Sequence, residues 1–346
     1  EALAPQDGLY TLITRGTDGD TFEVISSLTA VHAAGDHAAW LGYLASPELA
    51  IVTLTVTEAG YLRGPGGGLD VAHPGVVADI AALRADASAS VGTTPGKLVA
   101  GLLARRAAGA GPIAVVSCDN LSHNGDVLAG VVGELAASVD PTLPAWIAAN
   151  VAFATTMVDR ITPATTDEHR ASVLAATGFE DAAPVPTEPF SEWVVQGEFP
   201  AGRPAWDAAG ARFVDDVAPF ERRKLALLNG SHSLMAYAAT ILGHETVADA
   251  IADPRVLGWV EQWWDEACAH IPLPAGELVD YRAALLDRYR NPNIRHALAQ
   301  IAADGSLKIA VRALPTFRAE LDAGRTPVGS ARVIAAWVLH LRGLGA

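Results

Sequence analysis

Residues 113–125, Ile-Ala-Val-Val-Ser-Cys-Asp-Asn-Leu-Ser-His-Asn-Gly, decide the fold class of this chain. Residues 113–117 form an apolar run of the kind that occupies the interior of a parallel sheet. Polar residues follow at once, and the pattern becomes helical over about 125–138. Ligands of open α/β sheets bind beyond the carboxyl ends of the strands. Asp119 and Asn120 therefore fall at a candidate ligand site.

The first third of the chain repeats this alternation of strand and helix. Alternating apolar residues predict strands at Leu9–Arg15, Phe22–Leu28 and Ile51–Thr57. Helical patterns follow at about 75–86 and 95–108. Together these elements predict a doubly wound, Rossmann-like α/β domain. Thr57 and Glu58 fall at the carboxyl end of a strand, which makes them candidate cofactor contacts.

From about residue 215 the pattern changes to helix alone. Apolar residues recur with helical spacing in segments 217–242, 246–270, 276–302 and 327–343. We predict a boundary near residue 214, with an α/β domain over 1–214 and a mainly helical domain over 215–346. Residues 181–210 are rich in proline and glycine. They are predicted to form a long connection packed by Trp193 and Trp206.

Composition argues against several classes of function. The 346 residues include 24 Lys and Arg against 39 Asp and Glu, which gives a net charge of −15. Nucleic acids and anionic membrane surfaces both attract basic proteins, so we expect neither as a partner. No apolar run approaches the length of a membrane span. The two cysteines are far apart in sequence, and we expect a cytoplasmic protein without a disulfide framework.

The densest polar cluster in apolar surroundings is Lys-Leu-Ala-Leu-Leu-Asn-Gly-Ser-His at 224–232. In a continuous α-helix, five positions turn about 140° and eight about 80°, so Lys224, Asn229 and His232 share a face. Leucine neighbours desolvate the lysine, which favours its neutral form and lowers its pKa towards that of a general base. The alternative is a structural helix whose lysine extends its amine to solvent. Spacing alone leaves both interpretations open.

Two further clusters place polar residues among apolar ones. Asn120 and Asn124 follow a predicted strand, where asparagine is also common as a turn or cap residue. Asp159 and Arg160 lie within the run Met157–Pro163. They are interpreted as a buried or cleft-facing charged pair, or else as part of a surface loop.

The sequence lacks the motifs that are typical of hydrolases and metalloenzymes. Residues 244–248 have alanine where a zinc protease needs its second histidine. Residues 230–233 lack the Gly-x-Ser-x-Gly turn of a hydrolase. Residues 64–68 lack the glycine spacing that opens a helix beneath a pyrophosphate, and we predict a flexible loop. No cluster has the spacing of metal ligands, so the predicted chemistry needs no metal.

Five motifs occur in a fixed order along the chain: Ser-Cys-Asp-Asn-x-x-His-Asn-Gly (117–125), Met-Val-Asp-Arg-Ile-Thr-Pro (157–163), Lys-x-x-Leu-Leu-Asn-Gly-Ser-His (224–232), Asn-Pro (291–292) and Asp-Gly-Ser-x-Lys (304–308). Their order and separations resemble the polyol-specific long-chain dehydrogenases. This family includes mannitol 2-dehydrogenase, fructuronate reductase and tagaturonate reductase. The resemblance runs over essentially all 346 residues.

The resemblance implies a zinc-independent secondary-alcohol dehydrogenase that uses NAD, with NADP as an alternative. It implies that Lys224 is the catalytic base and that Asn120 and Asn229 stabilise the oxyanion. The remaining implied site residues are His232, which holds the substrate, Asp159 and Lys308, which contact its hydroxyls, and Glu221, which is associated with proton passage. A small polyol or uronate is the implied partner, and a monomer or weak oligomer is expected.

The sequence departs from the family in two respects. The family's glycine-rich pyrophosphate signature does not occur, and we expect the first βα unit to lie upstream of residue 1 and further helices to follow residue 344. Gln300 stands where mannitol dehydrogenases can carry a substrate-binding arginine, which favours the mannonate/fructuronate branch slightly. A uronate carboxylate would need a cation such as Arg160, Arg288 or Arg290.

An alternative function is a catalytically silent scaffold or binding protein that kept the fold but lost the nucleotide site.

Overall fold

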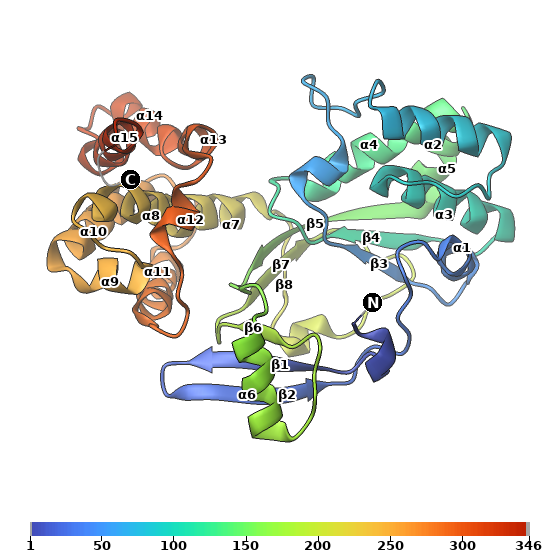
Figure 1. Ribbon diagram of the computed structural model, residues 1–346. Coiled ribbons are helices and arrows are strands. Elements are labelled where there is room, and N and C mark those ends of the chain that lie inside the picture. The colour runs from blue at the N-terminus through green and yellow to red at the C-terminus, as the bar shows by residue number, and fades with distance from the viewer. Residues whose placement is uncertain (1, 344–346) are drawn as a thin grey trace. The chain divides into compact units, whose positions relative to one another are not determined.

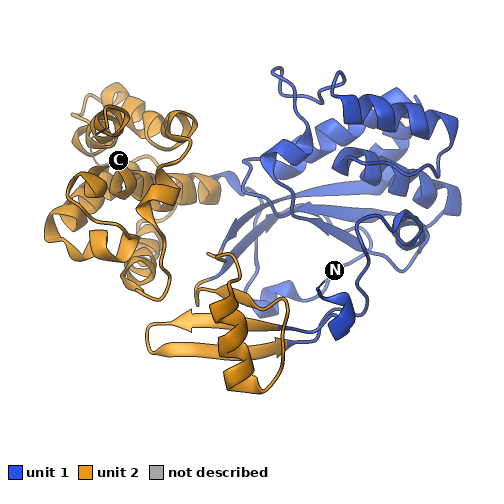
Figure 2. Cartoon of the chain, in the orientation of Figure 1, with its two compact units in different colours: residues 1–10, 25–159, 191–218 blue, residues 11–24, 160–190, 219–346 orange. Residues whose placement is uncertain are grey.

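The computed structural model describes residues 2–343. Contacts within the chain divide it into two compact units, which Figure 2 shows in different colours. Unit 1 consists of Glu1–Tyr10, Ile25–Asp159 and Ser191–Ala218, and unit 2 consists of Thr11–Val24, Arg160–Phe190 and Pro219–Ala346. Each unit is therefore built from segments that are separated in sequence. The boundary near residue 214 remains a prediction.

Unit 1 contains a five-stranded sheet (Figure 1). Its strands, in spatial order, are β3 (Ile51–Leu54), β4 (Ile113–Ser117), β5 (Val151–Asp159), β7 (Glu192–Gln196) and β8 (Arg212–Phe213). Strands β3, β4 and β5 run parallel, and β7 pairs antiparallel with β5. All five residues of β4 are buried, as the apolar run predicts. This confirms the Rossmann-like α/β class.

Helices cover the sheet of unit 1. They are α1 (His37–Ala45), α2 (Pro74–Ala85), α3 (Thr94–Ala108), α4 (Asn124–Val139) and α5 (Leu143–Asn150). Helix α4 packs on β4 and β5, and α2, α3 and α5 pack around α4. The fully buried Arg105 of α3 donates to backbone carbonyls, including those of Leu44, Ala110 and Pro112. Its guanidinium thereby ties the end of α1 and the loop before β4 to α3.

Unit 2 combines a small sheet with a helical bundle. The three-stranded sheet has the order β2 (Gly19–Ile25), β1 (Tyr10–Gly16) and β6 (Val185–Thr187), with helix α6 at Asp167–Thr177. The bundle begins with α7 (Ala218–Arg223), the π-helix η4 (Lys224–Asn229), α8 (Gly230–Leu234) and a second π-helix, η5 (Met235–Ala239). It continues with α9 (Val247–Ala252), α10 (Pro254–Cys268), α11 (Ala275–Arg290), α12 (Leu298–Ala302), α13 (Gly305–Arg312), α14 (Leu314–Asp322) and α15 (Val328–Leu341).

The end of α11 holds the β1–β2 hairpin within unit 2. The side chains of Asn291 and Asn293 donate to the carbonyls of Arg15 and Gly16, at 2.8 and 2.7 Å. Pro292 stands between the two asparagines and α11 ends at Arg290, since proline disfavours a helical residue before it. The predicted helix 276–302 is therefore interrupted.

Several other elements differ from the sequence prediction. Residues 181–210 are not only a connection, because they contain β6 and β7. The predicted packing between Trp193 and Trp206 is confirmed, with ring centroids 4.8 Å apart. The helix predicted over 217–242 alternates between α- and π-helical turns. Among residues 2–343, no helix is both long and apolar enough to span a bilayer.

Candidate functional site

The turn after β4 in unit 1 is held by a buried network around Asp119. One carboxylate oxygen accepts the backbone N–H of Val56 at 2.5 Å, and the other accepts the phenol of Tyr61 at 2.6 Å. Ser117 contacts both the same carboxylate oxygen and the Tyr61 hydroxyl. Burial and the hydrogen bond to Asp119 raise the pKa of Tyr61 above its usual range. The network fixes the turn after β4 against the segment after β3.

Asn124 holds the other side of the same turn. Its side-chain amide donates to the carbonyls of Asp119 and Thr156 and accepts the N–H of Thr156, each at 2.9 Å. Asn124 is fully buried, so it bridges the turn to β5 and is more than a helix cap. A Cβ at Gly125 would lie 2.6 Å from the Ala154 carbonyl oxygen, which explains the glycine in this motif. Asn120, between these two anchors, is exposed.

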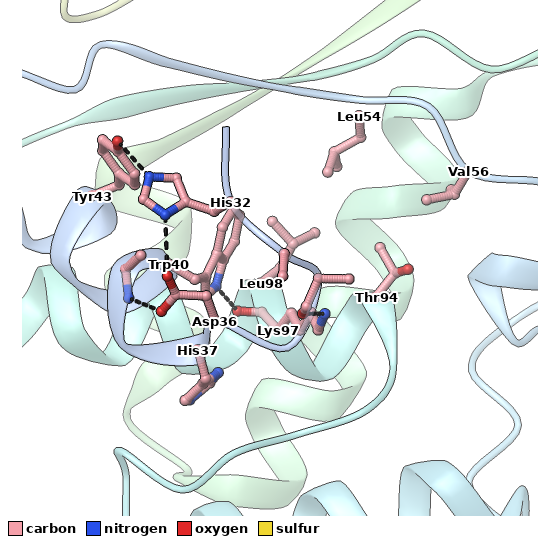
Figure 3. A pocket seen from close by; sticks show the side chains of 13 residues that line it. His32, Asp36, His37, Trp40, Tyr43, Leu54, Val56, Thr94, Lys97 and Leu98 are labelled. Carbon is pink, nitrogen blue, oxygen red and sulfur yellow. Dashed lines mark hydrogen bonds and ion pairs between the residues drawn. The ribbon is translucent and has the colours of Figure 1, made fainter. Parts of the chain in front are cut away.

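A cavity of about 430 Å³ lies beside the end of β3 in unit 1 (Figure 3). Trp40, Leu54 and Val56 form part of its apolar wall. At its rim, His32 bridges the Asp36 carboxylate and the Tyr43 hydroxyl, at 3.1 and 3.0 Å. The cavity is at the carboxyl end of a parallel strand, where α/β sheets bind ligands.

The predicted cofactor contacts Thr57 and Glu58 lie shortly after the end of β3. Thr57 and Glu58 follow Val56 directly and are exposed. Thr57 is the residue before η2 (Glu58–Tyr61), a short 3₁₀ turn. Strand β3 is at an edge of the five-stranded sheet.

In unit 2, Lys224 and Asn229 are the first and last residues of the π-helix η4. A π-helix is hydrogen bonded from i to i+5, so these two residues are one turn apart. In the continuous α-helix assumed from the sequence, Asn229 would lie about 140° around the axis from Lys224, so α-helical spacing does not give these two residues the shared face that we expected. π-Helical turns are frequent at functional sites. This local geometry brings the amine and the carboxamide closer to a common face than the α-helical spacing does.

His232 is buried three residues after η4. Its ring is 5.1 Å from that of Tyr289 and 5.0 Å from that of His296, measured between centroids. Its Nε2 is buried without a hydrogen-bond partner among the described residues. Burial above all, then the neighbouring His296 and the charges of Arg288 and Arg312, lowers the pKa of His232 well below its ordinary value. The imidazole is therefore neutral near pH 7, and a neutral imidazole can form a hydrogen bond with a hydroxyl group.

Lys308 and Arg312 lie one turn apart on α13. Lys308 Nζ donates to the Ile301 carbonyl at 3.2 Å, and Arg312 donates to the Asn229 carbonyl and to Ser233 Oγ, at 3.4 and 3.2 Å. Burial and the charge of Arg312 lower the pKa of Lys308. Within unit 2, Arg312 thus connects the helix that carries Lys308 to the end of η4.

Glu188 and Arg288 form a buried ion pair in unit 2. Glu188 also accepts the N–H of Ile161 at 2.6 Å, and its carbonyl accepts Arg160 Nε at 3.2 Å. The charge of Arg288 is therefore compensated within the protein. Arg160 itself is exposed, whereas its neighbour Asp159, the last residue of β5, is 4% exposed.

A second cavity, of about 190 Å³, lies in unit 2 beside the end of the 157–163 motif. Its lining includes Thr162, Pro163, Arg295, His296 and Gln300. His296 connects this cavity to His232 through their ring contact. Gln300, for which the sequence predicts a part in substrate choice, is thus at a cavity wall.

Residues 1–208 match the model of the mannitol dehydrogenase Rossmann domain, and residues 216–344 match that of the mannitol dehydrogenase C-terminal domain. The chain belongs to the mannitol dehydrogenase family. The family that the five motifs indicate is therefore confirmed.

Members of the mannitol dehydrogenase family with different substrates are similar to this chain. D-mannonate oxidoreductase of Escherichia coli (strain K12) is 39% identical, over 99% of this chain and 71% of the relative. D-arabinitol 4-dehydrogenase of Ralstonia nicotianae is 39% identical, over 99% of this chain and 73% of the relative. The structure of Pseudomonas fluorescens mannitol 2-dehydrogenase with NAD and D-mannitol is 38% identical, with a TM-score of 0.84, covering 99% of this chain and 69% of that one.

The residues of the predicted site are divided between the two units of this mannitol dehydrogenase family member. Unit 2 contains Lys224, Asn229, His232 and Lys308, with Glu221 buried on α7. Unit 1 carries Asn120, Asp159, Thr57 and Glu58. Sequence reasoning missed the contacts that Trp263, Trp264, Tyr289 and Arg312 make with the η4–α8 segment. The spacing of four residues between Lys308 and Arg312 was the one available signal for Arg312. Among the described residues, no group of three or more His, Cys, Asp or Glu could hold a metal ion.

Proposed function

We propose that this protein is an NAD-dependent, metal-independent oxidoreductase that interconverts a sugar alcohol or an aldonate with its keto sugar. The observation that carries the proposal is the π-helix η4, which begins at Lys224 and ends at Asn229, followed by the buried His232. The named activities of the similar mannonate, arabinitol and mannitol enzymes support the same reaction class.

In the proposed reaction, neutral Lys224 accepts the proton of the reacting hydroxyl through Nζ. Asn229 and Asn120 donate to the developing alkoxide, and His232 orients the substrate by a hydrogen bond. Fixed donors of this kind act where charge develops in the transition state. Bound NAD would supply the acceptor for the hydride of the carbinol carbon. In the reverse direction Lys224 returns the proton to the carbonyl oxygen.

The cofactor assignment rests on the carboxyl end of β3. The cavity of about 430 Å³ has the apolar wall and the few polar groups that are typical of small-molecule sites. We propose that this cavity receives part of the dinucleotide. Thr57 and Glu58 directly follow Val56, which lines the cavity, and Asn120 follows β4, the strand that pairs with β3. NADP is the alternative cofactor.

For the substrate we propose a hexonate/hexuronate pair ahead of mannitol and fructose. Gln300 at the wall of the unit 2 cavity supports this order. Arg288 is unsuited to bind a carboxylate because Glu188 already compensates its charge, and Arg290 is on the exposed end of α11. Arg160 remains the proposed cation, with Asp159 and Lys308 for hydroxyls and Glu221 for proton passage.

The test is oxidation of NADH and of NADPH by the full-length protein with fructuronate, tagaturonate and fructose in parallel. We expect turnover with at least one of these sugars, and the same rate after dialysis against EDTA. Silence with all three sugars and both coenzymes would support the alternative of a scaffold or binding protein. Loss of rate after EDTA, restored by a metal, would contradict metal independence.

A further inference from the structure

Four consecutive backbone carbonyls of the π-helix η4 accept hydrogen bonds from side chains. The donors and acceptors are Trp263 Nε1 to Ala226 (2.8 Å), Trp264 Nε1 to Leu227 (3.0 Å), Tyr289 OH to Leu228 (3.3 Å) and Arg312 Nη1 to Asn229 (3.4 Å). They come from three different helices, α10, α11 and α13. The wide turn is therefore bonded from several sides by groups outside its own helix.

The two indoles are the strongest of these constraints. Trp263 and Trp264 are fully buried, and an indole N–H is a donor only. A buried donor without an acceptor is costly, so each indole stabilises the arrangement in which its carbonyl turns towards it. Adjacent residues of α10 thereby hold adjacent carbonyls of η4. Side chains that enter the helical hydrogen-bond ladder are a recognised cause of departure from α-helical geometry.

Gly230 permits this close approach. A Cβ at residue 230 would lie 2.6 Å from Trp263 Cζ2 and 2.8 Å from its Nε1. The next residue, Ser231, donates back to the Leu227 carbonyl at 2.5 Å and contacts the Tyr289 hydroxyl at 2.7 Å. Gly230 thus allows the close contact with α10, and Ser231 adds a contact with α11.

We propose that Trp263 and Trp264 are positioning residues for the reaction, because their indole N–H groups hold Ala226–Asn229 in π-helical register and so keep Lys224 and Asn229 one turn apart. This inference rests on the proposed function. In α-helical register the carboxamide of residue 229 would lie about 140° around the helix axis from the amine. The residues act through η4 and need not touch the substrate.

The test replaces each indole by a phenyl ring, in Trp263→Phe and Trp264→Phe, in the full-length protein. Trp259→Phe is the matched control, because Trp259 is on the same helix and packs at the edge of the same core. We expect kcat to fall about tenfold in each test variant and to stay within about twofold in the control, since a net hydrogen bond of about 1.4 kcal/mol corresponds to a factor of ten. The KM for coenzyme should not change. The pH dependence of kcat should also shift, because the surroundings of the proposed base, Lys224, change.

A second measurement separates this inference from the proposed function. Amide hydrogen exchange over residues 224–235 should be faster in Trp263→Phe and Trp264→Phe than in Trp259→Phe. Equal exchange in all three variants would overturn the assigned role, whether or not the protein is active. An active protein in which the test variants match the control in kcat and pH profile would overturn it too. A wild-type protein that is inactive with every sugar, but shows the exchange difference, would contradict the proposed function and leave the register role standing.

Discussion

The carboxylate of Glu188 and the guanidinium of Arg288 face each other in a bidentate ion pair, with N–O distances of 2.8 and 2.9 Å. Their side chains are 2% and 4% exposed. The pair joins helix α11 to the segment after β6, and the Arg288 guanidinium also lies 4.2 Å from the centre of the Phe190 ring. A charge pair that is so well hidden from water is costly to break from one side.

Arg288→Met should therefore lower the free energy of unfolding by about 3–5 kcal/mol, because it leaves the Glu188 carboxylate buried and uncompensated. Urea denaturation measures this change. The control is Arg282→Met, which removes an ion pair with Asp265 at the surface and should cost less than about 1 kcal/mol. Adding Glu188→Gln to Arg288→Met should recover part of the loss. Equal losses in the two single variants would contradict the importance of the buried pair.

Tyr61→Phe tests the network that fixes the turn after β4. The variant removes the phenol that donates to Asp119 and leaves this buried carboxylate with fewer donors. We expect unfolding to become easier by about 1–3 kcal/mol, as measured by denaturant titration. Tyr43→Phe is the control, since Tyr43 is on the surface and its loss should change little. A Tyr61→Phe protein as stable as this control would show that the network contributes nothing net.

The sequence was informative where local pattern and tertiary structure agree. The run at 113–117 is almost entirely apolar and becomes the fully buried interior strand β4. Strand β5 was missed because its residues, Val151–Asp159, follow helix α5 without a turn signal and mix Thr with apolar residues. The short strands β6 and β7 were missed because proline and glycine dominate the segment around them. Their pairing is a tertiary effect that composition does not reveal.

The residues of the candidate site could be proposed from the sequence, but their local geometry could not. Lys224, Asn229 and His232 stand out by spacing and chemistry. Nothing in their own segment indicates a π-helix, because the donors that bind its carbonyls come from Trp263 and Trp264, more than thirty residues later. Likewise, the pairing of Arg288 with Glu188 could not be predicted from residues that are 100 positions apart.

Lys224→Ala should abolish most of the turnover if this lysine is the base. The proton of the substrate hydroxyl then has no acceptor of suitable pKa, and we expect a loss larger than the factor of about 10²–10³ that is usual for one oxyanion donor. Steady-state oxidation of the alcohol measures the effect. Added methylamine should restore part of the rate in this variant and none in the wild type. Near-full turnover of Lys224→Ala at neutral pH would show that another group is the base.

Asn229→Ala should lower kcat by about 10²–10³, which is about 3–4 kcal/mol, because one donor to the developing alkoxide is lost. The KM for the keto sugar should change much less, since the interaction strengthens as charge develops. Asn150→Ala is a suitable control, because the Asn150 side chain only donates to the Trp146 carbonyl at the end of α5. If both variants lose the same activity, Asn229 has no special part in the reaction.

The stability of unit 2 should fall with acid below about pH 6.5, the ordinary pKa of histidine. Burial and the charge of Arg288 lower the pKa of His296, and burial with neighbouring cations lowers that of His232 further. Between the folded and unfolded pKa values, the unfolded chain binds a proton that the folded chain does not, so acid favours unfolding. In this pH range each histidine lowers the free energy of unfolding by up to about 1.4 kcal/mol for each pH unit of acidification, and above the unfolded pKa it has no effect.

Urea midpoints between pH 8 and pH 5 measure how steeply stability changes with pH. His296→Phe keeps a ring against His232 and removes one titrating group, so its curve should run parallel to the wild type above pH 7 and fall less steeply below pH 6.5. Identical slopes in the acid range would show that His296 has no part in this loss.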